Sequence, residues 1–480
     1  MFKKALFAML GLEAASLFAF IYPSLAWPLL AAGFIFTVVA SWKRFEWGVY
    51  ILLGELFVGS RGHFLEVDLG FISLSLRLAI FLAVFIGAVK VLAQSPRGVW
   101  RGWRDVLPKS FWLLVLLVAA GIINGLLAGP LFGNVFLDAN GYFYLVALPF
   151  LFLAVRDRGE LMRILDILGA AVLVIAAQTL AVFLWFRLDL PGVATVYAWI
   201  LGDEIGEITG HVGEASRIFL QSQFYSLVSV FIFAFFTSKP IYRLVFAAAV
   251  FTVLMSLSRS FWLGGAAAAA FSLTLTLFWV RPGRSAFLRL AGRAAALALI
   301  AGAVVYALFS FGRGSDARTL SGRIENPAQE AAGQARLLLL PGLLDGIRAK
   351  PLLGYGFGKE LSYPSFLPDR MSAENPNGEI RTFAFEWGYL DLLLKLGLAG
   401  FLAYLWFVAK IFQKGFAVPQ GDRLLAAGFL GGLTALAVLN VTTPYLNHPL
   451  GIGYLIFAFV SFKLMSEQTE ESAASSQAPF

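Results

Sequence analysis

Residues 164–186 read ILDILGAAVLVIAAQTLAVFLWF, a run with a single charged side chain, Asp166. Because an α-helix rises about 1.5 Å per residue, a run of this length crosses the hydrocarbon core of a bilayer, which is about 30 Å thick. Runs of about 17–25 apolar residues recur from one end of the chain to the other. They predict an all-α polytopic membrane protein and argue against a barrel of alternating strands.

The composition supports the same fold class. Of the 480 residues, 59% are hydrophobic and 14% are charged, whereas about a quarter are charged in a typical soluble domain. The net charge of +8 would suggest nucleic acid in a soluble protein, but most cations here lie in short loops between apolar runs, where they set the topology. We therefore predict no nucleic-acid partner. The absence of cysteine excludes disulfides and thiol chemistry.

The apolar runs predict twelve to fourteen spans, because the runs at 47–60 and 241–257 are marginal in length. Lys3 and Lys4 place the N-terminus in the cytoplasm. With fourteen spans, every strongly basic short loop falls on that same side, which supports the count. The predicted spans are 5–22, 26–41, 47–60, 74–94, 110–128, 139–154, 164–186, 218–237, 241–257, 261–280, 291–310, 384–409, 424–440 and 449–465.

Four parts of the chain follow from this topology. Residues 1–310 are predicted to form the first eleven transmembrane helices, and 311–383 a large extracytoplasmic cap loop that contains short helices. Residues 384–465 are predicted to form the last three helices, and the polar segment 466–480 a disordered cytoplasmic tail. Long loops in a compact membrane protein usually carry function, so we look for the site in the cap.

Lys and Arg normally collect in the cytoplasmic loops of membrane proteins. Three arginines instead lie at the predicted outer ends of spans: Arg217, Arg259 and Arg336. An arginine at the apolar boundary is costly unless it snorkels, pairs or binds an anion. Because a guanidinium binds phosphate oxygens bidentately and stays charged, the set predicts a polyanion site. The alternative is that each arginine snorkels or pairs with an acidic neighbour such as Glu214.

Glu386 lies at the predicted start of the helix that follows the cap. If that helix begins near 383, Glu386 shares a face with Tyr389 and Leu390. A carboxylate at the membrane edge beside an aromatic ring suits a general base, and Tyr389, Glu379 and Arg381 are weaker candidates for glycan contacts. The alternative is that Glu386 pairs with Arg381 or another cap arginine, and that Tyr389 belongs to the interfacial belt.

Two other features predict no cofactor. The histidines, His63, His211 and His448, all fall in outer segments, but their spacing does not predict a metal site. The stretch Gly354–Lys359 superficially resembles a phosphate loop, yet it lacks the GxxxxGK[ST] spacing and a surrounding parallel sheet. We predict neither a metal nor a nucleotide.

The order of these motifs resembles the O-antigen ligase/polymerase superfamily of bacterial envelope glycan assembly. The family pattern has an arginine that opens a helix, a Leu-Ser-Arg-Gly-Ala-Trp-Leu type turn, a loop arginine before Pro-Leu-Leu-Gly-x-Gly-x-Gly, and His-Asn-x-Tyr-Leu before Gly-Leu-x-Gly. The similarity spans roughly 210–405, and this chain carries Glu386 where ligases of the family typically carry histidine. The corresponding residues here are Arg217, Leu257–Leu263, Arg336, Pro351–Gly358, Glu386–Leu390 and Gly397–Gly400.

The resemblance implies a metal-independent inverting glycosyltransferase in the bacterial inner membrane, with its active site facing the periplasm or exterior. Its partners would be a polyprenyl-diphosphate-linked oligosaccharide, an acceptor glycan, membrane lipid and a regulator of chain length. Arg217, Arg259 and Arg336 would stabilise the departing diphosphate, and Glu386 would act as base. Glu386 in place of histidine favours a polymerase over a ligase that acts on a lipid or protein acceptor. Two competing hypotheses are a flippase for lipid-linked glycans and a peptidoglycan polymerase.

Overall fold

The computed structural model describes the chain except residues 71–72, 95–101, 130, 211, 214–215, 236–238, 311–330, 365–374, 376–377 and 477–480. Eleven helices within the described residues are long and apolar enough to cross a membrane, which confirms the predicted all-α polytopic class. These spans are formed by α1 (Phe2–Ile21), α2 (Ala26–Lys43), α4 (Leu76–Gln94), α6 (Lys109–Leu127), α7 with α8 (Phe132–Ala139 and Ala147–Ala154), α9 (Arg158–Arg187), α13 (Arg259–Leu275), α14 (Arg284–Ser310), α17 (Gly388–Phe416), α18 (Arg423–Leu439) and α19 (Pro449–Ser476).

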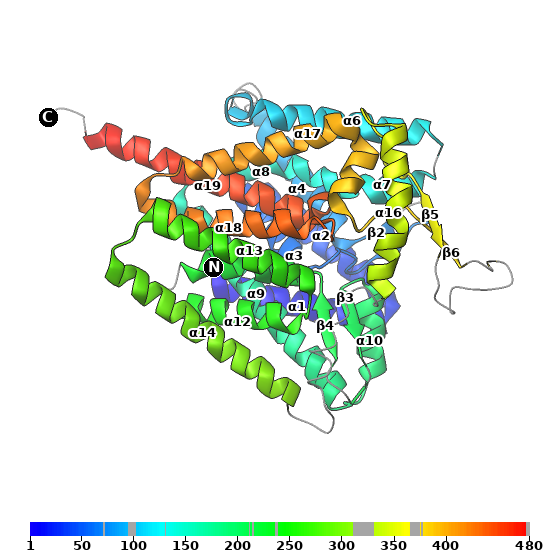
Figure 1. The fold of residues 1–480 in the computed structure, drawn as a ribbon, viewed down its shortest axis with the longest axis horizontal. Coiled ribbons are helices and arrows are strands. Elements are labelled where there is room, and N and C mark those ends of the chain that lie inside the picture. The colour runs from blue at the N-terminus through cyan, green and yellow to red at the C-terminus, as the bar shows by residue number, and fades with distance from the viewer. Residues whose placement is uncertain are drawn as a thin grey trace.

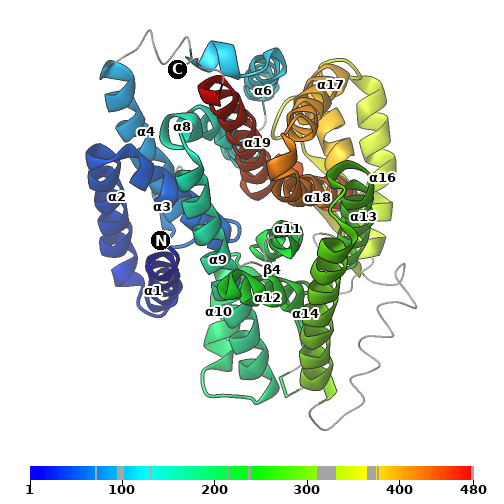
Figure 2. The ribbon, with the colours of Figure 1, turned by 90° about the vertical axis from the view of Figure 1, so that its left-hand side faces the viewer.

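Three shorter helices occupy the remaining predicted spans: α3 (Phe45–Val58), α11 (Gln223–Ala234) and α12 (Pro240–Met255). The span predicted at 218–237 is wrong in its extent, because its first residues form a strand and the helix begins at Gln223. At about 1.5 Å per residue, α11 is too short to cross a bilayer alone. It lies at the centre of the bundle, surrounded by other helices (Figure 2), so protein covers its ends in place of lipid.

One end of the bundle, which we call the basic end, gathers loops that the sequence placed in the cytoplasm. There Arg158 pairs with Asp422 at 2.7 Å, and Arg423 Nη1 donates to the carbonyl of Trp279 at 3.0 Å. These contacts agree with the predicted topology, since each joins segments assigned to the same side. The basic end comprises the segments 42–44, 155–158, 281–284 and 410–423.

The opposite end, which we call the cap end, carries the non-helical structure. Figure 1 shows it at the right, with α16 upright along the edge and the hairpins beside it. The described part of the segment 311–383, which was predicted to contain short helices, holds the helix α16 and also the hairpin β5–β6. The elements of the cap end are β1–β2 (Val67–Asp68 and Ser73–Leu74), α10 (Val193–Gly202), β3–β4 (Gly206–Thr209 and Arg217–Leu220), α16 (Ala331–Ala349) and β5–β6 (Leu361–Pro364 and Glu379–Thr382).

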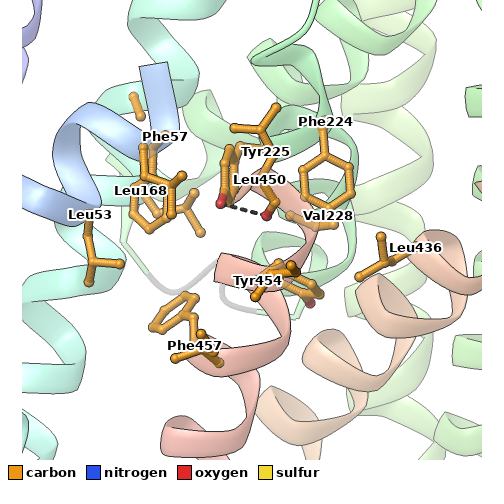
Figure 3. Close-up of a cluster of buried hydrophobic side chains, with 14 of the residues drawn as sticks. Leu53, Phe57, Leu168, Phe224, Tyr225, Val228, Leu436, Leu450, Tyr454 and Phe457 are labelled. Carbon is orange, nitrogen blue, oxygen red and sulfur yellow. Dashed lines mark hydrogen bonds between the residues drawn. The ribbon is translucent and has the colours of Figure 1, made fainter. Parts of the chain in front are cut away.

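The core lies where α3, α9, α11, α18 and α19 meet, and Figure 3 shows its aromatic centre. The rings of Phe57 and Tyr225 pack at a tilt of 58° with their centroids 4.6 Å apart, and the Tyr225 hydroxyl donates to the carbonyl of Leu450 at 2.8 Å. A buried tyrosine needs such a partner for its hydroxyl. This contact anchors the start of α19, the most buried of the long helices, to α11.

The C-terminal segment differs from its prediction. The tail predicted to be disordered from 466 is helical as far as Ser476, as a continuation of α19. Glu, Gln and Ala are good helix formers, and Lys463 pairs with Glu467 one turn later at 3.1 Å. The helix therefore continues beyond the apolar part of α19 that is suited to cross the membrane.

Candidate functional site

The cap brings Arg336 and Glu386 together. Arg336 lies in the first half of α16, Glu386 lies two residues before α17, and the guanidinium and carboxylate form an ion pair. The Glu386 side chain is 51% exposed and that of Arg336 is 28% exposed, so both are open to a ligand from outside. Of the two possibilities that the sequence left open for Glu386, pairing with a cap arginine therefore occurs.

Two aromatic neighbours fix the position of Glu386. Phe385 is buried in a small core with Leu339, Leu343 and Leu394, and this core packs α16 against α17. The Trp387 indole donates to the carbonyl of Arg336 at 2.9 Å. Since the residues on both sides point inward, the carboxylate between them points out.

The predicted helical face through Glu386 is wrong. The helix begins at Gly388, not near 383, so Glu386 precedes it and does not share a helical face with Tyr389. The reason is that Trp387 has a non-helical backbone, at φ −87° and ψ 82°. Glu386 is positioned by its neighbours Phe385 and Trp387 in the contact between α16 and α17, not by a place on the helical face of α17.

Arg217 and Arg259 meet at the turn between α12 and α13. Arg217 opens strand β4, not a helix, and its Nε donates to the carbonyl of Ser256 at 2.9 Å. Its Nη1 lies 3.5 Å from a carboxylate oxygen of Glu207, on the paired strand β3. Arg259 is the first residue of α13, three residues after Ser256. The turn between them holds Leu257 at a positive φ of 46°, a strained conformation for a leucine.

The loop after α18 lies between these two pairs of residues. The Ser260 hydroxyl, next to Arg259, is 2.9 Å from the Thr442 hydroxyl. Gly388, next to Trp387, packs so closely on Asn440 that an added Cβ would lie 2.5 Å from its carbonyl oxygen. The segment 440–442 therefore contacts a neighbour of each pair, Ser260 beside Arg259 and Gly388 two residues after Glu386.

The weaker predicted residues are placed differently from one another. Glu379 and Arg381 are exposed on strand β6, where a ligand above Glu386 can reach the same hairpin. Tyr389 instead donates its hydroxyl to the carbonyl of Ala437 on α18, at 2.7 Å. Of the other side chains considered, His211 and Glu214 lie outside the described residues.

A buried charge cluster lies beneath the site, and the sequence reasoning missed it. The ammonium of Lys395 lies 2.5 Å from Asp138 and also pairs with Asp391, and all three side chains are at most 7% exposed. Asp391 accepts from the Asn447 amide, and Lys395 lies 5.2 Å from the ring centroid of Phe385, the neighbour of Glu386. The sequence did contain an indication of this cluster, because Asp391 and Lys395 are charged residues one helical turn apart inside an apolar run.

The glycine-rich stretch that begins at Pro351 has a structural role. Gly397 has a φ of 63° and a ψ of −171°, which breaks α17 and leaves backbone groups on both sides without helical partners. The turn and loop at 351–356 supply partners for those backbone groups. The four hydrogen bonds are Leu398 N to Pro351 O (2.8 Å), Ala399 N to Leu352 O (3.1 Å), Tyr355 N to Leu394 O (2.9 Å) and Gly356 N to Lys395 O (2.9 Å).

Glycine is required at this contact for steric reasons. A Cβ on Gly397 would lie 2.3 Å from the carbonyl oxygen of Leu352, and one on Gly356 would lie 2.3 Å from the amide nitrogen of Gly125 on α6. Gly356 also has a φ of 84°. Asp138 completes the contact, since it accepts from the amide of Gly358 at 2.7 Å while it binds Lys395.

The fold and this site define a multi-pass membrane protein with a cationic site at one end of its helix bundle. Residues 244–405, about a third of the chain, match the family described as O-antigen ligase. The match confirms the predicted resemblance to the O-antigen ligase/polymerase superfamily over this segment, and it supports an enzyme in general terms. The segment contains Arg259, Arg336 and Glu386, whereas Arg217 precedes it. No curated protein matches the chain.

Proposed function

We propose that the protein is an inverting glycosyltransferase that moves glycan from a polyprenyl diphosphate onto an acceptor glycan at the cap end, which faces the periplasm or exterior. The observation that carries this proposal is the exposed Arg336–Glu386 pair, a cation and a carboxylate at the membrane surface. A donor with a polyprenyl tail stays in the bilayer, so its diphosphate is presented at this level. We favour a polymerase, in which the acceptor is itself a growing glycan.

In the proposed step, the acceptor hydroxyl oxygen attacks the anomeric carbon from the face opposite the diphosphate. The bond from that carbon to the diphosphate oxygen breaks, and its electron pair leaves with the diphosphate. Glu386 accepts the hydroxyl proton. Arg336, with Arg217 and Arg259, stabilises the charge that develops on the departing diphosphate, and cations fixed in advance do so without reorganisation. These cations take the part that a metal ion plays in other transferases.

The ion pair suggests how the resting site becomes active. Glu386 occupies the Arg336 guanidinium until a diphosphate arrives, and a dianionic group competes well for a guanidinium. The exchange releases the carboxylate next to the bound donor, where a base is needed. Glu386 therefore serves first as the counter-ion of Arg336 and then as the base.

The test is glycan transfer by the purified protein after Arg336→Ala, with Arg348→Ala as a matched control. Arg348 lies on the same helix and is 77% exposed, with Asp345 as its ion-pair partner. We expect Arg336→Ala to abolish transfer from a lipid-diphosphate-linked oligosaccharide, and Arg348→Ala to retain it, at equal protein levels. Full transfer by the Arg336→Ala variant would show that the assignment is wrong.

A further inference from the structure

A groove lies between α2 and α4 at the basic end, far from the cap. Its volume is about 510 Å³. Trp42 lines it from α2, and Phe85, Ile86, Val89 and Ala93 line it from α4. Lys90 and Gln94, also on α4, are the polar side chains that line the groove, and the other lining side chains are apolar.

The groove opens on the perimeter of the bundle. Figure 2 shows α2 and α4 at its edge, and α2 is among the least buried of the spans. The side chains of Trp42, Phe85 and Val89 are each about half exposed, at 51%, 47% and 49%. In a membrane-spanning bundle such a surface faces lipid. A hollow there must be filled, because atoms that line a void lose their dispersion contacts. A flexible acyl chain fits this shape.

Lys90 gives the groove a fixed charge at its rim. Its ammonium donates to the carbonyl of Trp42 at 2.6 Å and lies 5.0 Å from the centroid of the indole ring. An ammonium has three donors, so two of them stay available to a ligand. Lys43 and Arg44 follow directly and are exposed, so three cations stand around the end of α2.

We infer that this groove is a binding site for an anionic phospholipid. One acyl chain lies along Phe85, Ile86 and Val89, and the phosphate accepts hydrogen bonds from Lys90. Charge complementarity selects the headgroup, because a net negative lipid gains from the Lys43, Arg44 and Lys90 cluster and a zwitterionic lipid gains less. The inference does not depend on the proposed transferase activity.

The test uses the fluorescence of Trp42, which lies in the groove wall. The protein is reconstituted in phosphatidylcholine vesicles that contain either brominated phosphatidylglycerol or brominated phosphatidylcholine as quencher. The Trp42 signal is obtained as the difference between the protein and its Trp42→Phe variant. We expect brominated phosphatidylglycerol to reach half-quenching at about a fivefold lower mole fraction than brominated phosphatidylcholine, the factor for one lysine near a lipid surface.

Lys90→Ala should reduce this preference while both lipids still quench Trp42, which shows that the groove remains formed. Lys109→Ala is the matched control, since Lys109 is an exposed lysine at the start of α6 that does not line the groove. It should retain the preference. Equal quenching by the two lipids in the unmodified protein would overturn the inference, and so would a preference that is as large in Lys90→Ala as in the unmodified protein.

Discussion

The Arg336–Glu386 ion pair gives the two residues separable roles in the proposed reaction. Glu386→Gln removes the base but also removes the carboxylate that competes with the donor for Arg336. We expect transfer to fall by about 100-fold or more, as for loss of a general base, while the donor binds at least as tightly as before. Single-turnover rates and donor affinity measured on the same preparation check this. Weaker donor binding with an unchanged rate would contradict the assigned roles.

The buried cluster around Lys395 is expected to stabilise the cap through charge balance. Lys395→Met leaves Asp138 and Asp391 buried without their cation, and the loss of one member of such a pair typically costs about 3–5 kcal/mol. The triple replacement Asp138→Asn, Asp391→Asn and Lys395→Met removes every charge and should cost much less. Thermal unfolding in detergent compares the two variants. Equal losses would mean that charge balance is not the reason for the cluster.

His63 is expected to make stability depend on pH. Burial lowers the pKa of His63, but its bond to Glu66 and the charges of Glu66 and Glu204 raise that pKa overall, above the ordinary 6.5. Burial raises the pKa of Glu66, but His63 lowers it overall, below the ordinary 4.5. The stabilisation from His63 is complete below pH 6.5 and is lost as pH rises through its raised pKa. That from Glu66 is complete above pH 4.5 and is lost as pH falls through its lowered pKa.

The pair therefore holds the loop after α3 most firmly between about pH 4.5 and pH 6.5. Arg61 of the same loop also binds Glu204, at 2.8 Å, so the link reaches α10. Thermal stability measured across pH should fall on the alkaline side, and His63→Gln should flatten that fall. If thermal stability falls equally at alkaline pH in the His63→Gln variant, groups other than His63 cause the fall.

A local rule singled out Arg259, Arg336 and Glu386, because charge at a span end is unusual. The structure pairs Arg336 with Glu386 and places Arg259 at the start of α13, and the roles of all three stay predictions. Lys395 and Asp391 were missed although they obey the same rule. Their partners Asp138 and Asn447 lie far away in the chain, so only the fold shows that the cluster is satisfied.

At the level of elements, the break in α17 explains the glycine motifs. Gly397→Ala places a Cβ 2.3 Å from the Leu352 carbonyl at a φ of 63°, so the segment 351–356 must move away. We expect faster limited proteolysis of the cap and a lower melting temperature. Gly342→Ala is the control, because a Cβ at that helical position meets nothing within 4 Å. Similar behaviour of the two variants would contradict a steric role for Gly397.

The same break bears on the hypothesis of a transporter. Transporters use discontinuous helices whose free backbone groups coordinate substrates or ions near the middle of the membrane. In this protein the four backbone groups at the break are occupied by residues 351–356, so they are not available to a substrate. The observation favours an enzyme with a docked cap. It was not predictable from the sequence, since each partner lies roughly forty residues or more from the other.

For the whole molecule, hydropathy and loop charge predicted most of the architecture, because both rules are local to each span. The predicted element boundaries are wrong where tertiary contacts override these two local rules. The strand that begins at Arg217 replaces part of a helix because β3 pairs with it, and α11 can be short because the bundle encloses it.

The most direct test of the central claim is incubation of the purified protein with a polyprenyl-diphosphate-linked oligosaccharide, followed by gel analysis of the glycan and detection of released polyprenyl diphosphate. We predict a ladder of longer glycans, with one polyprenyl diphosphate released for each bond formed. A single transferred unit on a lipid or protein acceptor would identify a ligase in place of a polymerase. Movement of the intact donor across the bilayer without bond formation would contradict the transferase account.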